Sequence, residues 1–325
     1  MQNVLSESPF GAGGFAGSLT GQDKGRTNLP PGTGASGGAT TVTRTIADIR
    51  ARMEACAKDG VLVGLVPTMG FFHEGHLSLM RAARPECTLV VVSIFVNPIQ
   101  FGAGEDFNTY PRDFDRDFEM AAAAGADIIF APAAAELYPD AFDTMVVPGN
   151  LAEGLCGAAR PGHFRGIATV VAKLFNIVRP GIAYFGQKDA QQVAVIRHMA
   201  RDLNYNVGIR VCPTVREPDG LAMSSRNIYL SKDERSQASV LYEALLEAKA
   251  AASAGQTSAA GIRRQIKRKI ASQYLADLEY VGIVSPDTLE PVSEIKAEVL
   301  AAVAAKFGRA RLIDSMTLSP GGDNA

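Results

Sequence analysis

Apolar runs and amphipathic stretches alternate along residues 45–212 of this 325-residue chain. The runs lack the alternating polar positions of a half-exposed strand, so they predict strands that are buried on both faces of a parallel sheet. They cover residues 61–66, 88–96, 127–132, 182–185 and 207–212. Apolar residues recur at helical spacing between them, which predicts helices at 45–59, from His73 to about Ala83, and at 113–125, 167–178 and 191–203. This order predicts an α/β fold with a Rossmann-like, doubly wound parallel sheet, whose ligands lie beyond the carboxyl ends of the strands.

A second, smaller domain is expected after the last of these runs. Residues 213–216, Pro-Thr-Val-Arg, are interpreted as the hinge into it, so that the domains are residues 41–213 and 214–325. The pattern in the second domain predicts helices near 232–253 and 258–273 and short strands near 276–284 and 309–316. This mixture is typical of an α+β unit.

Residues 1–40 differ from the rest in composition. They hold ten glycines together with Ser, Thr, Pro and Ala, and they show little periodic apolar content. Such a segment cannot bury enough apolar surface to offset the entropy lost on ordering, so a disordered N-terminal extension is predicted. It also lacks the basic region and compact apolar core of a signal peptide.

Composition narrows the class of protein. Hydrophobic residues make up 47% of the chain, charged residues 20%, and the net charge is −2. No basic block predicts a nucleic-acid surface, and no apolar run is long enough to predict a membrane span. The four cysteines are scattered without a Cys-x-x-Cys pair, which favours reduced thiols in a cytoplasmic protein over disulfides or a zinc site.

The most informative stretch is residues 67–76, Pro-Thr-Met-Gly-Phe-Phe-His-Glu-Gly-His, which follows the first buried run. Pro67 has no amide hydrogen and is expected to stop the strand, while Gly70 allows a tight turn. His73 and His76, three residues apart, then lie on one side of the first helical turn. The free amides and dipole of that turn favour an anion, so the pattern predicts a phosphate grip rather than a metal site.

Two later motifs can add positive charge and hydroxyl groups. Residues 186–189, Gly-Gln-Lys-Asp, follow a predicted strand, so Lys188 is placed to reach phosphates as a point charge. Residues 223–226, Met-Ser-Ser-Arg, supply two hydroxyls and a guanidinium in one loop. Each motif by itself also fits an ordinary surface lysine or a structural loop.

These motifs occur in one chain together with residues 97–102, Asn-Pro-Ile-Gln-Phe-Gly, and with the pair Gln191-Gln192. The ordered set resembles the pantothenate synthetase (pantoate–β-alanine ligase) family of the nucleotidyltransferase-like superfamily, over roughly residues 42–318. The resemblance implies an ATP-dependent ligase that condenses pantoate with β-alanine to pantothenate for coenzyme A synthesis. The implied reaction passes through a pantoyl adenylate and releases AMP and pyrophosphate.

The resemblance also implies roles for individual residues. Residues 41–213 would bind nucleotide and pantoate, and residues 214–325 would form the lid. His73 would be the catalytic proton donor, and Gln100 and Gln192 would bind pantoate, with Gln100 also contacting β-alanine. The implied ATP-binding residues are Met69, Gly70, Phe71, Phe72, His73, Glu74, Gly75, His76, Gly186, Gln187, Lys188, Asp189, Val215, Met223, Ser224, Ser225 and Arg226.

Further contacts are hypotheses that rest on the same resemblance. Met69 and Phe95 would form an apolar wall for the methyl groups of pantoate, and Asn97 would be a further pantoate contact. Arg160 and His163 fall in the mobile flap region of the family. A homodimer is implied as well.

Magnesium is expected with ATP, because it bridges phosphate oxygens and takes only one or two protein carboxylates. Asp117 matches the acidic position that the family uses after the Tyr-Pro-Arg motif. The residue before it, often acidic in the family, is Arg116 in this chain. This departure weakens the case for a two-carboxylate site, and Asp117 also fits a solvated acid near a helix start.

One alternative is a sister enzyme of the same superfamily, and the other belongs to a different class of function. Another adenylyltransferase of the superfamily, acting on a nucleotide precursor, would explain the His-x-Gly-His and Ser-Arg motifs but not residues 97–102 or 191–192. A non-enzymatic relative that keeps only the fold would be marked by a broken phosphate grip. The grip is intact in this chain, with His73, His76, Lys188, Ser224, Ser225 and Arg226 all present.

Overall fold

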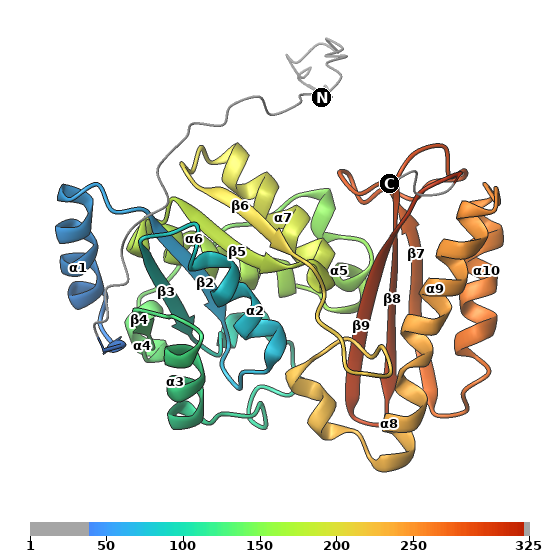
Figure 1. Ribbon diagram of the computed structural model, residues 1–325, viewed down its shortest axis with the longest axis horizontal. Helices are drawn as coiled ribbons and strands as arrows, with labels where there is room; N and C mark the ends of the chain where they lie inside the picture. Colours follow the sequence, from blue (N-terminus) through green and yellow to red (C-terminus); the bar gives the residue numbers. More distant parts are fainter. Residues whose placement is uncertain (1–38, 322–325) are drawn as a thin grey trace, which may run out of the picture. The chain divides into compact units, whose positions relative to one another are not determined.

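The computed structural model describes residues 39–321, and all of them belong to one compact unit. The predicted extension at residues 1–40 therefore lies outside the described residues, except for its last two positions. The described part contains one parallel and one antiparallel sheet with helices around them (Figure 1). The α/β prediction with a smaller C-terminal α+β part is confirmed. The proposed boundary between residues 213 and 214 stays a prediction.

The parallel sheet has six strands in the order β1-β4-β3-β2-β5-β6. They are β1 (Thr41–Thr43), β2 (Val63–Thr68), β3 (Leu89–Ile94), β4 (Ile128–Phe130), β5 (Ile182–Gly186) and β6 (Gly208–Cys212). Consecutive residues of β3 pack into cores on opposite faces: Val91 faces one, and Val90 and Val92 face the other. A continuous apolar run is therefore what this sheet requires, because both of its faces are covered.

The expectation that Pro67 ends its strand is wrong, because β2 runs on to Thr68. Pairing with β5 involves only Gly64 and Leu65, whereas pairing with β3 continues to Thr68. At Pro67 the strand is therefore held from one side only. A missing amide hydrogen is tolerated at such a position.

The helices cover the two faces of this sheet unequally. The core on one face includes residues of α1 (Ile46–Lys58), α6 (His163–Val178) and α7 (Ala190–Asp202), and the other includes α2 (Glu74–Ala83) and α3 (Phe114–Ala123). Helix α6 begins four residues before the predicted start, because Gly162 adopts a left-handed φ of 83° that turns the chain into the helix. The short helices α4 (Ala134–Leu137) and α5 (Cys156–Ala159) lie in the connections.

The C-terminal part packs three helices against an antiparallel sheet of order β7-β8-β9 (Figure 1). Its elements are α8 (Lys232–Ala238), α9 (Val240–Ser253), α10 (Ala259–Ile270), β7 (Ala276–Val284), β8 (Val299–Phe307) and β9 (Ala310–Leu318). The single helix expected at 232–253 is divided at Ser239, and β8 is not among the predicted strands. No helix in residues 39–321 is long and apolar enough to cross a membrane.

Candidate active site

A cavity of about 240 Å³ lies beyond the carboxyl ends of β2, β3 and β5, where the parallel sheet meets the loop at residues 223–226. The cavity brings together most of the predicted site residues. Those that line it are Met69, His73, Gly75, His76, Gln100, Gly186, Lys188, Asp189, Gln192, Val215, Met223, Ser224, Ser225 and Arg226. Those that do not are Gly70, Phe71, Phe72, Glu74, Gln187 and Asp117.

The residues outside the lining have other contacts. Phe72 is 1% exposed and belongs to the core under the turn. Glu74 forms an ion pair with Arg81 at the surface. The carbonyl of Gln187 accepts a hydrogen bond of 3.3 Å from the Ser315 hydroxyl of β9. None of these three residues therefore lines the cavity.

The two histidines are fixed at the start of α2 by hydrogen bonds with the main chain. His73 is the N-cap, and its Nδ1 accepts from the Gly75 amide at 3.1 Å. The His73 amide in turn donates to Nδ1 of His76 at 3.3 Å. Since both Nδ1 atoms accept, each neutral ring carries its proton on Nε2. Both rings line the cavity, so these Nε2–H groups are available to an anionic ligand.

Burial keeps both imidazoles neutral. It lowers the pKa of His73 to about 4, with further contributions from the positive charges of Lys188 and Arg116. Burial likewise lowers the pKa of His76 well below its usual value, with His73 and Lys188 adding to the effect. The pKa of Lys188 is itself lowered by burial, against the opposing charge of Asp189. An anion entering the cavity would meet two neutral imidazole donors beside the partly compensated charge of Lys188.

The Met-Ser-Ser-Arg loop lies directly against the histidine turn. The hydroxyl of Ser225 donates to the Phe71 carbonyl at 3.2 Å, and Ser225 is buried. Arg226 makes two hydrogen bonds with the Asp106 carboxylate, at 2.9 and 2.8 Å. Burial opposes the charge of Arg226, but the bonds and charge of Asp106 raise its pKa. The guanidinium is thus held at the cavity wall by a carboxylate.

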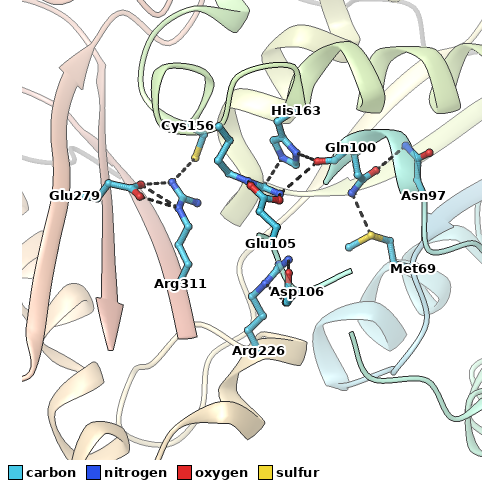
Figure 2. A network of polar contacts seen from close by, with 11 residues as sticks. Met69, Asn97, Gln100, Glu105, Asp106, Cys156, His163, Arg226, Glu279 and Arg311 are labelled. Atoms are coloured by element: carbon cyan, nitrogen blue, oxygen red, sulfur yellow. Dashed lines mark hydrogen bonds and ion pairs between the residues drawn. The ribbon is translucent and has the colours of Figure 1, made fainter. Parts of the chain in front are cut away.

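The predicted substrate amide Gln100 belongs to a network with its neighbours (Figure 2). Asn97 donates to Oε1 of Gln100 at 3.0 Å, and Nε2 of Gln100 donates to the Met69 sulfur at 3.1 Å. Tyr138 donates to Asn97 at 2.9 Å. Gln192 lines the cavity, whereas the amide of Gln191 is bound to main-chain groups elsewhere. Only the second glutamine of the pair is therefore positioned for a ligand.

Arg160 and His163 also line the cavity, and an acid holds the arginine. Arg160 makes two hydrogen bonds with Glu105, at 2.8 and 2.5 Å, and donates to Nε2 of His163 at 2.7 Å. Nδ1 of His163 then donates to the Gln100 carbonyl at 2.8 Å (Figure 2). Burial, followed by the charge of Arg160, lowers the pKa of His163 to about 3. No sequence motif pointed to the roles of Glu105 and Asp106, because the two acids form no recognisable local pattern.

The apolar wall extends beyond the predicted Met69 and Phe95. It includes Ile167, Val170, Val171 and Leu174 of α6. These four positions have the spacing of one helical face, so the sequence carried a signal for them. The signal was ambiguous, because the same spacing describes a face that packs on a sheet.

Asp117 does not fit the role of a magnesium ligand. It is 1% exposed, it does not line the cavity, and its two oxygens accept from the amides of Phe71 and Phe72. Residues 39–321 contain no cluster of three or more His, Cys, Asp or Glu side chains suited to a metal. Asp189 is the only carboxylate among the described residues that line the cavity.

Comparisons with known proteins identify the family of this chain. The family described as pantoate-beta-alanine ligase matches residues 41–317. The pantothenate synthetase of Acetivibrio thermocellus is 54% identical over 275 residues, which cover 85% of this chain and 98% of that protein. The pantothenate synthetase structure from Thermus thermophilus has a TM-score of 0.81 at 46% identity and covers 86% of this chain and 100% of its own.

A second solved structure was determined with ligands. The pantoate-beta-alanine ligase of Francisella tularensis, complexed with beta-gamma ATP and beta-alanine, has a TM-score of 0.71 and 33% identity. The match covers 86% of this chain and 97% of that one. Since the family match and these relatives span nearly the whole described chain, the protein belongs to the pantoate–β-alanine ligase family.

Proposed function

We propose that this enzyme, whose family condenses pantoate with β-alanine at the expense of ATP, works through a pantoyl adenylate. In the first step a pantoate carboxylate oxygen attacks the α-phosphorus of ATP, and the bond to the β-phosphate oxygen breaks to release pyrophosphate. In the second step the neutral amine of β-alanine attacks the pantoyl carbonyl carbon. The carbonyl–oxygen bond to AMP breaks, AMP leaves, and the amine loses a proton as the amide forms.

One observation carries this proposal: a single cavity joins a phosphate-binding half to an amide-and-apolar half. His73, His76, Lys188, Ser225 and Arg226 line it beside Gln100, Gln192 and the apolar face of α6. Donors fixed in advance stabilise charge that develops in a transition state, and a shared cavity brings the reacting groups together. Closure around the mixed anhydride would keep it from water.

Specific roles follow within the proposal. The Nε2–H of His73 donates to the phosphates as charge develops on the leaving pyrophosphate, while Lys188 and Arg226 neutralise that charge. Gln100 and Gln192 bind the hydroxyl and carboxylate groups of pantoate, and the α6 face packs against its methyl groups. A homodimer and a cytoplasmic location stay predictions. Magnesium bound to ATP stays one too, and no step here depends on a protein ligand for it.

Isotope exchange between pyrophosphate and ATP tests the first step. Label should enter ATP when pantoate is present without β-alanine, and added β-alanine should then yield AMP and pantothenate in equal amounts. Replacing pantoate with a nucleotide precursor separates the sister activity, because exchange with that compound alone would favour the other adenylyltransferase class. If label enters ATP with neither pantoate nor the nucleotide precursor, the proposal is contradicted.

A further inference from the structure

The turn before His73 is held by a side chain that does not line the cavity. The two oxygens of Asp117 accept from two consecutive amides, those of Phe71 at 2.6 Å and Phe72 at 2.7 Å. Asp117 lies in the first turn of α3, so it reaches the turn from a different element. A carboxylate that accepts two main-chain donors in this way forms strong, charge-assisted hydrogen bonds.

The backbone of this turn requires such support. Gly70 has a φ of 81°, and Phe71, which has a side chain, has a φ of 51°. Left-handed backbone is unfavourable for a bulky non-glycine residue and persists only where surrounding contacts enforce it. A Cβ atom added at Gly70 would lie 2.9 Å from an oxygen of Asp117, so the glycine also makes room for the carboxylate.

The carbonyls of the same two residues are held as well. Arg116 donates to the Phe72 carbonyl at 3.0 Å, and its guanidinium lies 5.2 Å from the centroid of the Phe71 ring. Ser225 donates to the Phe71 carbonyl at 3.2 Å. Both amides and both carbonyls of the Phe71–Phe72 pair are thus bound by side chains. Because His73 is the next residue, these contacts also fix the position of its backbone.

We propose that Asp117 is a positioning residue that fixes the turn carrying His73 and His76, and that it does not bind magnesium. Its oxygens are already engaged by the two amides, and the side chain has almost no exposed surface through which an ion could reach it. Arg116, which stands where the family often has an acid, completes the same clamp with a donor. The inference rests on the proposed function only for its effect on rate, because the clamp itself can be observed without substrate.

The test compares Asp117→Asn and Asp117→Ala with Asp115→Asn, which changes an exposed acid of the same helix. Hydrogen exchange followed by NMR, on the protein without substrates, measures the exchange rates of the Phe71 and Phe72 amide hydrogens. Asparagine keeps one acceptor but turns an NH₂ group toward the second amide, and alanine removes both acceptors. Exchange of these two amides should accelerate at least tenfold in Asp117→Asn and further in Asp117→Ala, and it should be unchanged in Asp115→Asn.

Magnesium titration distinguishes a positioning role from a metal-ligand role, because loss of a ligand would raise the magnesium concentration that the reaction requires. In pantoate-dependent ATP–pyrophosphate exchange, Asp117→Asn should lower the maximal rate about 10- to 100-fold, on the scale of a displaced charge-stabilising donor. The magnesium concentration giving half the maximal rate should stay within twofold of the wild-type value. A tenfold rise in that concentration, or unchanged exchange of the two amides, would overturn the proposal.

Two further points keep the test sharp. If Asp117→Ala does not fold, Asp117→Asn carries the comparison, because it preserves volume and one hydrogen bond. If the wild-type protein shows no pantoate-dependent exchange, the proposed function fails. The amide measurement still decides whether Asp117 clamps the turn.

Discussion

The two halves of the proposed phosphate-binding wall are held by different kinds of contact. The histidine turn is bound through its main chain, by Asp117, Ser225 and the caps of α2. The guanidiniums of Arg160 and Arg226 are bound mainly through carboxylate side chains, those of Glu105 and Asp106. A ligand cannot replace the first set of contacts without unfolding the turn. It can replace the second, because a phosphate offers an arginine the same acceptor geometry as a carboxylate.

The histidines and Arg226 are therefore expected to contribute to the reaction in different ways. The histidines are already held in place, so in the proposed mechanism they bind ATP without rearrangement. If Arg226 binds phosphate as proposed, it exchanges Asp106 for that ligand, so part of its interaction energy replaces an existing ion pair. Replacing a histidine of the turn should therefore lower the rate of adenylate formation strongly. Replacing Arg226 should lower that rate more than it weakens the binding of ATP.

The largest effect is expected at His73. His73→Ala should slow adenylate formation by roughly 10²–10³-fold, because one preorganised donor to the developing charge is lost. Pyrophosphate exchange measures the rate, and thermal unfolding should show a folded protein. Arg81→Ala, which removes a surface ion pair from the last turn of the same helix, is the matched control and should leave the rate unchanged. Near-normal exchange in His73→Ala would refute the phosphate role.

A smaller effect is expected at Arg226. Arg226→Ala should lower the single-turnover rate of adenylate formation by about 100-fold while weakening equilibrium ATP binding only several-fold. Arg226→Lys should recover part of the rate, because lysine cannot reproduce the planar fork. Rapid-quench kinetics and calorimetric titration on the same variants make the comparison. Equal losses in rate and affinity would show a uniform binding contact instead.

A still smaller effect, with opposite signs in binding and rate, is expected at Asp106. Asp106→Asn removes the charge that competes for Arg226, so ATP should bind about 2- to 5-fold more tightly. The rate should fall by roughly 3- to 10-fold, because the guanidinium loses the partner that orients it. Calorimetry and single-turnover kinetics report the two changes. Weaker ATP binding would mean that Asp106 supports the bound state instead of competing with it.

The last expected effect is on stability at acid pH, with no direct effect on the reaction at neutral pH. The pKa of His163 falls to about 3 in the folded protein, so between pH 6.5 and 3 the unfolded state binds more protons. The free energy of unfolding should therefore decrease as pH falls through this range, by up to about 1.4 kcal/mol per pH unit from this group. Urea unfolding of the wild type and of His163→Gln at pH 7 and pH 5 measures the slope. His163→Gln should show a shallower loss, and an equal slope would contradict the assignment.

Local sequence pattern carried much of the fold and of the phosphate grip. Strands that are buried on both faces must be continuously apolar, and a turn that ends in a helix start needs its glycine and capping residues within a few positions. The runs around β2 to β6 and the motif from Gly70 to His76 can therefore be predicted from the local sequence. Such features depend on neighbours in sequence, which a single chain displays.

Other features depended on partners far along the chain. The strand β8, Val-Leu-Ala-Ala-Val-Ala-Ala-Lys-Phe, is rich in a residue that favours helices. It becomes a strand because β7 and β9 flank it, and its small side chains let α9 and α10 pack closely. Tertiary pairing outweighs local propensity there.

Asp117 shows the same limit within the site. Sequence alone placed an acid near a helix start and, by resemblance, near magnesium. Only the fold brings its two oxygens to amides 45 and 46 positions earlier in the chain. The pairings of Arg160 with Glu105 and of Arg226 with Asp106 likewise span 55 and 120 positions. The chain by itself determined which chemical groups were present, whereas the tertiary structure decided which of them meet, because hydrogen bonds and ion pairs act only over a few ångströms.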